Sequence, residues 1–127
     1  MTGKDIFDMA LDLLGLRKED GSYSEDTGDL YQRSLWLINI LLAENSWIDY
    51  RIRLKEPDLI RIADMEEVID CHPHILMSVI PYGLASLFLY GENTPIAREM
   101  NSRYEKARTE ALKAGRAKAE AIREVYV

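Results

Sequence analysis

Residues 75–90 read Ile-Leu-Met-Ser-Val-Ile-Pro-Tyr-Gly-Leu-Ala-Ser-Leu-Phe-Leu-Tyr, and this stretch contains no charged residue. A membrane span needs roughly 20 apolar residues to cross about 30 Å of hydrocarbon. This stretch is shorter, contains Pro81 and Gly83, and has no Lys/Arg cluster on either flank to set an orientation. We therefore predict a helix that is buried in a protein core.

Pro81 falls in the middle of the predicted core helix. Proline lacks a backbone N–H and its ring pushes against the carbonyl four residues earlier, so a bend is predicted there. Gly83 and Ala85 follow at once, and their small side chains should let a neighbouring helix approach closely. Gly91 is predicted to end the helix, because glycine adopts the left-handed conformation at low cost.

Three segments of the chain resemble a known family. Residues 80–89 (Ile-Pro-Tyr-Gly-Leu-Ala-Ser-Leu-Phe-Leu) look like the Pro-Tyr-Gly-Leu-Ala core helix of the head–tail connector (adaptor) proteins of long-tailed bacteriophages. Residues 62–70 (Ile-Ala-Asp-Met-Glu-Glu-Val-Ile-Asp) are similar to the acidic link that precedes that helix. Residues 37–44 (Leu-Ile-Asn-Ile-Leu-Leu-Ala-Glu) resemble the family's Leu-Asn-x-Leu-Leu-x-Glu helix. The resemblance depends on the order of these segments and on the chain length rather than on one specific motif.

This resemblance implies a structural role in a phage or prophage. Such connectors assemble as a ring, typically twelve-fold, beneath the portal protein and extend the DNA channel toward the tail. The implied partners are the portal, neighbouring copies of the chain and the next connector protein on the tail side. DNA would pass through the channel without specific binding, and no membrane is involved. The implied location is the head–tail junction of the virion, after synthesis in the host bacterial cytoplasm.

Length and charge agree with a small structural protein. A chain of 127 residues is long enough for one hydrophobic core. Residues 1–97 carry 8 Lys/Arg against 17 Asp/Glu, a net charge of −9, whereas residues 98–127 carry 8 against 5, a net charge of +3. Because affinity for DNA comes largely from neutralising phosphates, the acidic body argues against nucleic-acid binding.

The basic C-terminal region suits an acidic partner or the acidic body of a neighbouring copy. A solvated helix of mixed charge explains it equally well. The residues predicted to contact a partner are Arg103, Lys106, Arg108, Lys113, Arg116, Lys118 and Tyr126. The lone Cys71 excludes an internal disulfide and is typical of a reducing compartment, and the first residues show no signal-peptide pattern.

Two helices are predicted before the buried stretch. Thr2 and Asp5 form a capping pattern at the start of the first. The second is predicted to begin near Thr27 and to end between residues 45 and 49. Asn39 lies in its apolar centre, so its amide should bond to a nearby backbone group, because an unpaired buried amide costs about 1–3 kcal/mol.

The pattern changes after the second helix. Apolar and basic residues alternate over residues 50–55, and residues 56–58 (Glu-Pro-Asp) favour a turn. This predicts a short extended or hairpin excursion. The last helix is predicted to start at Thr94 and Pro95. Small and apolar residues then recur at a spacing of three and four, which predicts contact with one partner helix: Ala97, Met100, Tyr104, Ala107, Ala111 and Ala114.

The predicted fold is therefore an all-α bundle of about four helices, with the extended excursion between helices 2 and 3. Residues 1–115 are predicted to form one connector-like helical domain, and residues 116–127 a C-terminal tail that is disordered in the isolated protein. The large aromatic residues at helical spacing are predicted to lie mostly in the core: Trp36, Trp47, Tyr82, Phe88, Tyr90 and Tyr104.

The best candidate for chemistry is the segment 70–74, Asp-Cys-His-Pro-His. Cys71, His72 and His74 are zinc-type ligands, but a structural zinc site needs four ligands and the chain has no second Cys/His cluster. The simpler interpretation is a helix start, with Asp70 or His72 as the cap and Pro73 in the first turn. We predict no enzyme activity and no cofactor. Two alternatives stay open, a small helical protein-binding or regulatory module and a metal-dependent enzyme centred on Cys71, His72 and His74.

Overall fold

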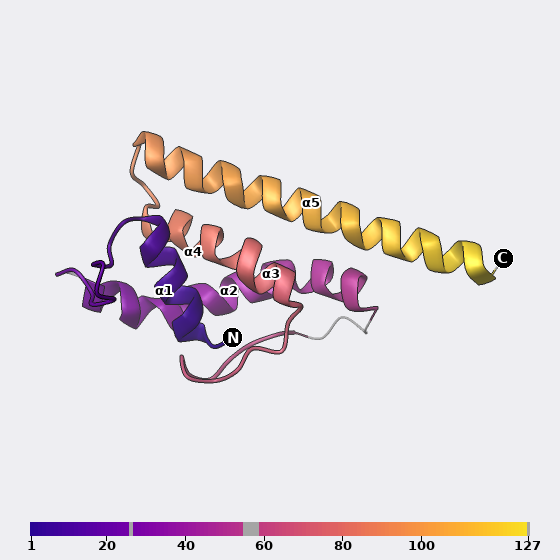
Figure 1. The fold of residues 1–127 in the computed structure, drawn as a ribbon, viewed down its shortest axis with the longest axis horizontal. Coiled ribbons are helices and arrows are strands. Elements are labelled where there is room, and N and C mark those ends of the chain that lie inside the picture. Colours follow the sequence, from indigo (N-terminus) through magenta and orange to yellow (C-terminus); the bar gives the residue numbers. More distant parts are fainter. Residues whose placement is uncertain (26, 55–58, 127) are drawn as a thin grey trace.

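The computed structural model describes residues 1–25, 27–54 and 59–126, and the side chains of residues 117–126 lie outside that description. The described residues form an all-α bundle, which confirms the predicted fold class (Figure 1). Two isolated β-bridges are the only strand-like pairings among them. No helix in the described part of the chain has the length and apolarity needed to cross a membrane. The helices are α1 (Gly3–Leu13), α2 (Thr27–Arg53), α3 (Pro73–Ser78), α4 (Ile80–Phe88) and α5 (Pro95–Tyr126).

Helix α4 is the centre of the bundle, where it packs against α1, α2 and α5. Ile80, Leu84 and Ala85 on this helix have no exposed surface, so the uncharged stretch is the core element that the sequence predicts. The prediction of one bent helix over residues 75–90 is wrong in one respect. The stretch divides at Val79 into α3 and α4, because Pro81 cannot donate the next backbone hydrogen bond and instead occupies the first turn of a new helix.

Gly83 lies where three helices meet. A Cβ atom placed on it would be 2.7 Å from the ring of Tyr104 on α5 and 2.8 Å from a methyl group of Leu41 on α2. Both distances are shorter than real side chains tolerate, so the absence of a side chain here permits the helices to approach. This confirms the predicted role of the small residues after Pro81.

The ends of α1 and α4 follow their sequence signals. Thr2 and Asp5 form the complete capping box, in which each side chain accepts a hydrogen bond from the other residue's backbone N–H. Helix α1 ends at Leu13, and α4 ends at Phe88 before Gly91, which has a φ of 88°. The left-handed conformation at Gly91 was predicted, although the helix ends slightly earlier.

Helix α2 is longer than the sequence predicts and ends at Arg53. The first extended segment predicted over residues 50–54 is therefore wrong, because Ile52 is buried one helical turn after Ile48 and extends the apolar face of the helix. Leu54 then leaves the helix with a φ of 56°. The predicted turn at residues 56–58 lies outside the described residues.

An irregular loop follows from residue 59 to His72, and the side chain of Asn39 attaches it to α2. The Asn39 amide donates to the carbonyl of Ile62 (3.0 Å), and its oxygen accepts from the Ile62 N–H (2.8 Å). This confirms that Asn39 bonds to backbone. Among the described residues, the non-helical excursion is present over residues 59–72, whereas residues 50–53, the predicted first strand of the hairpin, are helical.

Helix α5 begins as predicted, with Thr94 as the cap that accepts from the Ala97 N–H. It packs on both α2 and α4 rather than on one partner helix. Within residues 112–116, Gly115 is buried, whereas the predicted Ala114 is exposed. A straight helix has 3.6 residues per turn and drifts out of a seven-residue repeat, which moves Gly115 toward α2. The helix continues to Tyr126. Disorder of residues 116–127 in the isolated protein stays a prediction.

Candidate partner-binding surface

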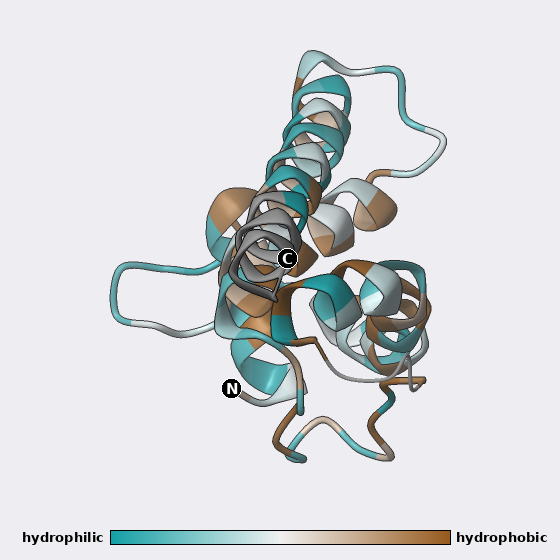
Figure 2. Cartoon of the chain, turned by 90° about the vertical axis from the view of Figure 1, so that its right-hand side faces the viewer, coloured by the Kyte–Doolittle hydropathy of each residue, from teal (hydrophilic) through white to brown (hydrophobic). Residues whose placement is uncertain are grey.

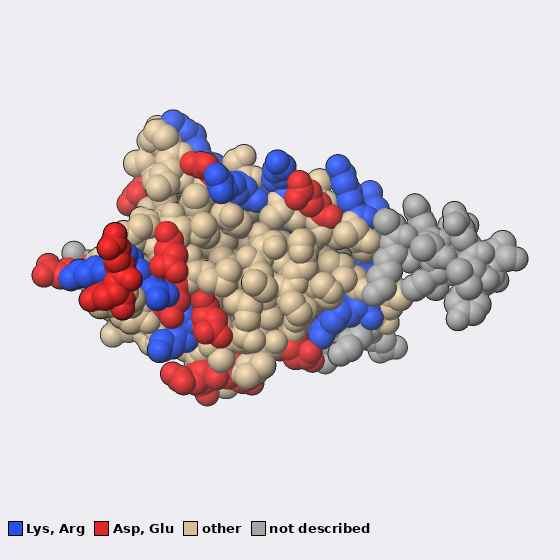
Figure 3. All heavy atoms as spheres, viewed as in Figure 1, with Lys and Arg blue, Asp and Glu red and all other residues tan. Residues whose placement is uncertain are grey.

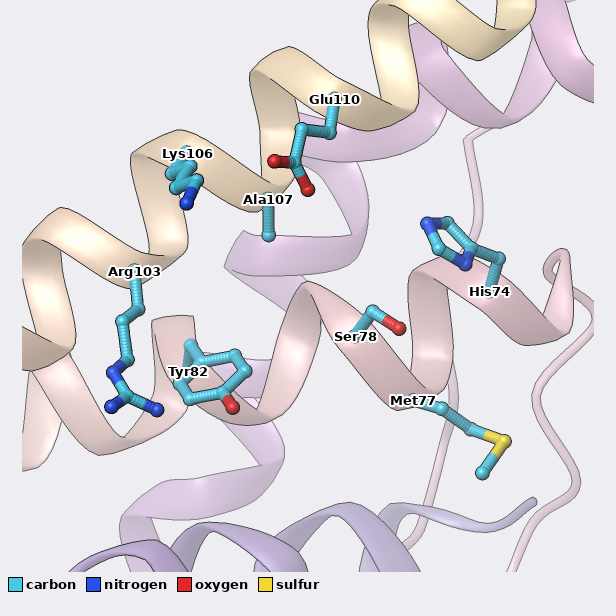
Figure 4. Close-up of a pocket in the computed structure, with 8 residues that line it drawn as sticks. All are labelled: His74, Met77, Ser78, Tyr82, Arg103, Lys106, Ala107 and Glu110. Carbon is cyan, nitrogen blue, oxygen red and sulfur yellow. The ribbon is translucent and has the colours of Figure 1, made fainter.

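A groove of about 500 Å³ runs between α5 and the α3–α4 pair. Figure 4 shows Arg103, Lys106 and Glu110 on the α5 side of this groove, opposite His74 and Tyr82. The guanidinium of Arg103 lies 5.8 Å from the centre of the Tyr82 ring and donates to Glu99. Cations above an open groove attract carboxylates, so this groove is suited to an acidic partner.

A second cleft of about 300 Å³ lies on the opposite side of α5, against α2. It contains Arg108 and Arg116 from α5 together with Trp47 and Arg51 from α2. Arg108 is bound within the molecule: its Nε donates to the Asn45 side-chain oxygen at 3.1 Å. Arg116 is exposed and lines the same cleft.

Arg108 belongs to a polar network that joins α2 to α5. The Tyr104 hydroxyl donates to Glu44 at 2.5 Å and accepts from Asn45 at 3.0 Å. Burial and then the hydrogen bond to Glu44 raise the pKa of Tyr104. The phenol therefore stays protonated and acts as a structural hydrogen-bond donor. No sequence pattern predicted this network, because the residues that it joins are about 60 positions apart along the chain.

The predicted contact residues therefore do not form one surface. Arg103 and Lys106 lie in the α3–α4 groove, and Arg108 and Arg116 lie in the α2 cleft. Lys113 is exposed and lines neither. The side chains of Lys118 and Tyr126 lie outside the described residues.

The segment 70–74 forms a helix start. His72 caps α3 by accepting from the His74 N–H, and Pro73 occupies the first turn, as predicted. Cys71 is buried, and desolvation followed by the negative charge of Asp49 raises the pKa of its thiol to about 12. A thiol in that environment is not a nucleophile at neutral pH. Within the described part of the chain, no three His, Cys, Asp or Glu side chains come together as a metal site.

A second polar network holds this helix start in place. Asp49 on α2 is 3% exposed and binds Arg53 through contacts of 2.6 and 2.9 Å. Its other oxygen accepts from the His72 N–H at 2.7 Å, while Arg53 also binds Asp70 at 2.7 Å. The spacing of Asp49 and Arg53 by four residues was a signal for the ion pair, but not for its attachment to α3.

The prediction that the large aromatic residues lie mostly in the core is wrong for three of them. Trp36 is 72%, Trp47 51% and Tyr90 87% exposed, although Tyr104 is buried. Trp36 and Trp47 lie on the side of α2 that faces away from the buried residues Ile38, Leu41, Leu42, Asn45, Ile48 and Ile52. Helical spacing therefore identified an apolar face but not the direction in which it points.

Comparisons with known proteins returned no match to this chain, whether against family models, curated proteins or solved structures.

Proposed function

We propose that this chain is a head–tail connector subunit of a long-tailed bacteriophage or prophage, a structural protein without enzymatic activity. It would join copies of itself in a ring beneath the portal, extend the DNA channel and receive the next connector protein on the tail side. Its location would be the head–tail junction of the virion. The proposal rests on the resemblance of residues 37–44, 62–70 and 80–89 to that family.

The packing of these three segments supports the proposal. Asn39 in the first segment forms both hydrogen bonds to Ile62 in the second. Leu41, also in the first, contacts the position of Gly83 in the third. The three segments therefore meet one another in the bundle through Asn39, Leu41 and Gly83, as expected if they define one family fold.

The charge distribution also supports assembly, because the molecule has an acidic region and a basic region at separate places. Figure 3 shows carboxylates gathered over α1 and the loop after it, and Lys and Arg side chains along α5. Residues 1–32 carry 3 Lys/Arg against 8 Asp/Glu, whereas residues 95–116 carry 6 against 3. Opposite charges at separate places on one molecule favour contacts between different surfaces of adjacent copies.

Native mass spectrometry tests the proposal, with the protein alone and mixed with the portal protein encoded beside it. A ring of many copies on the portal is the expected result. A fixed small oligomer that ignores the portal would overturn it. Deletion of residues 116–127 tests the docking role of the C-terminal region, and unchanged portal binding and infectivity would exclude that role.

A second candidate function, a small helical protein-binding or regulatory module, is favoured by one observation. Trp36 and Trp47 are exposed on one face of α2, and contiguous exposed apolar residues mark interaction sites. A stable dimer that is indifferent to the portal would support this alternative over the connector.

A further inference from the structure

Two cavities on the α3–α4 side of the molecule meet at Met77 and Tyr82. One is the groove of about 500 Å³ between α5 and the α3–α4 pair, and the other is a hollow of about 330 Å³ between α1 and the same pair. Met77 and Tyr82 belong to the walls of both. Both volumes lie in the range of roughly 300–1,000 Å³ that is typical of ligand sites. One ligand that passes over Tyr82 can therefore occupy both cavities.

The hollow is mainly apolar. Its apolar walls are Met9 and Leu13 of α1, Met77 of α3 and Pro81 and Tyr82 of α4. Met77 is 56% exposed, so the hollow is open to a ligand. Two thioethers beside a tyrosine ring suit an aromatic side chain, because contacts between sulfur and aromatic rings are favourable. The one carboxylate in the wall, Asp12, is already paired with Arg17 at 3.5 Å.

The groove carries opposite charges at its two ends. Helix α5 supplies its polar wall, and Figure 2 shows the described turns of this helix largely in hydrophilic colours. Figure 4 places Arg103 and Lys106 with Tyr82 toward one end. Glu110 lies with His74 toward the other end, about 10 Å further along α5 than Arg103. The cationic end is therefore the end at Tyr82, where the groove meets the hollow.

The two cations at this end are accessible to a carboxylate. Arg103 binds Glu99 at 2.9 Å, but the two side chains are 51% and 54% exposed. Ion pairs with this exposure are weak, so a carboxylate of a ligand can compete for the guanidinium. Arg103 also lies 5.8 Å from the centre of the Tyr82 ring, beside the residue that both cavities share. Lys106 follows within one helical turn and is exposed.

We propose that the groove and the hollow together bind an acidic peptide segment of a partner protein. One apolar side chain of the segment occupies the hollow, and the carboxylates beside it bind Arg103 and Lys106. Glu110 repels a carboxylate at the far end of the groove, so the charge pattern also sets the direction of the segment. A nucleic acid has no apolar side chain for the hollow, so a peptide fits both cavities better. This inference goes beyond the connector proposal and does not depend on it.

An NMR titration of the full-length protein tests this site with a defined probe. The probe is a seven-residue peptide with a central phenylalanine, a glycine on each side of it and two aspartates at each end. It should shift the amide signals of α3, α4 and the first half of α5, with a Kd of about 1 mM or below. Arg103→Gln with Lys106→Gln should raise the Kd by about tenfold. Arg33→Gln with Lys113→Gln removes the same charge from exposed positions outside both cavities, so it should raise the Kd by less than about twofold.

Two single variants test the hollow and the direction of the segment. Met77→Ser removes part of the apolar wall and should raise the Kd by about threefold or more. It should have no effect on a probe that carries serine in place of the phenylalanine. Glu110→Gln should lower the Kd by about twofold, because it removes a repulsive charge from the groove. All the substituted side chains are exposed, so the melting temperatures should change little.

Every other outcome overturns the inference. No shifts with the probe at about 5 mM, or equal binding of a probe with lysines in place of the aspartates, would exclude an acidic peptide. Equal effects of the two double variants would mean that only the overall charge matters. A single-stranded oligodeoxynucleotide that displaces the probe would make a nucleic acid the ligand, and dimerisation that excludes the probe would make a second copy the occupant. The connector proposal is tested separately, by portal binding.

Discussion

The packing at Gly83 leads to a quantitative prediction for Gly83→Ala. The added methyl group would lie 2.7 and 2.9 Å from two atoms of the Tyr104 ring and 2.8 Å from Leu41. Ordinary van der Waals contacts begin near 3.4 Å. Either α5 moves away from α4 or the Tyr104 ring shifts, and a shifted ring weakens the hydrogen bonds of its hydroxyl to Glu44 and Asn45.

Two opposing effects set the magnitude. Overpacking a well-packed core costs typically 1–3 kcal/mol, and contacts this short at three atoms place Gly83→Ala near the upper end, at about 3 kcal/mol. The replacement of glycine by alanine inside a helix returns about 1 kcal/mol. The net loss in the free energy of unfolding is therefore about 2 kcal/mol. For a domain of this size, that lowers the melting temperature by roughly 8 °C.

Urea denaturation followed by far-UV circular dichroism measures this loss. An unchanged slope of the unfolding free energy against urea concentration shows that the variant and the wild type expose the same amount of surface on unfolding. Gly28→Ala is the matched control. Gly28 is also in a helix, but a Cβ atom there has nothing within 4 Å. That variant should be as stable as the wild type or gain up to about 1 kcal/mol.

A double-mutant cycle identifies the contact responsible. Leu41→Val removes the methyl group nearest to the new Cβ atom, so Gly83→Ala should cost less in that background than in the wild type. If Gly83→Ala is as stable as the Gly28→Ala control, the close approach of α2, α4 and α5 at this position is refuted.

Three further predictions concern the loop and the polar core. Asn39→Ala removes both bonds to Ile62, so it should cost about 1–3 kcal/mol in unfolding free energy and accelerate hydrogen exchange at the Ile62 amide; equal exchange rates would refute the attachment. Asp49→Ala removes the buried ion pair with Arg53 and the hydrogen bond to the His72 N–H, so it should lower the free energy of unfolding by about 2–4 kcal/mol. Glu99→Ala removes a half-exposed ion pair with Arg103 and is the control. In the same urea titration it should lower the free energy of unfolding by less than about 1 kcal/mol. Burial raises the pKa of Cys71 from 9.0 to about 12, so the unfolded chain loses this proton first and stability should fall as the pH rises from about 9 toward 12. The fall should be smaller in Cys71→Ala, and a thiol reagent at pH 8 should modify Cys71 only after unfolding; rapid modification of the native protein would contradict its burial.

Local signals predicted the elements that depend on local chemistry. The capping box at Thr2 and the Thr94–Pro95 start of α5 involve residues three or four apart, so the sequence contains all of the partners. The uncharged stretch predicted the central helix because only a core can hold it. The alternating residues 50–54 were misleading, since burial of Ile52 in the bundle outweighed the local period-two pattern.

The candidate surface was less predictable. Charge counts indicated a basic α5, but they did not show that Arg108 is bound to Asn45 inside the bundle while Arg116 lines an open cleft. Trp36 lies in the apolar run 35–43 that surrounds much of α2, and Trp47 follows the end of this run by one helical turn. The sequence shows that such a helix has apolar sides, and only the positions of α4 and α5 decide which sides are covered.

The sequence by itself determined the all-α class, a core helix within the uncharged stretch 75–90, the helix caps and the need of Asn39 for a backbone partner. These features depend on residue type and on spacings of a few residues, both of which are visible in the sequence. The tertiary structure decided the break at Val79, the replacement of Ala114 by Gly115 in the α5 contact, the two polar networks and the exposure of Trp36 and Trp47. These depend on contacts between residues tens of positions apart, and the packing of whole helices sets such contacts.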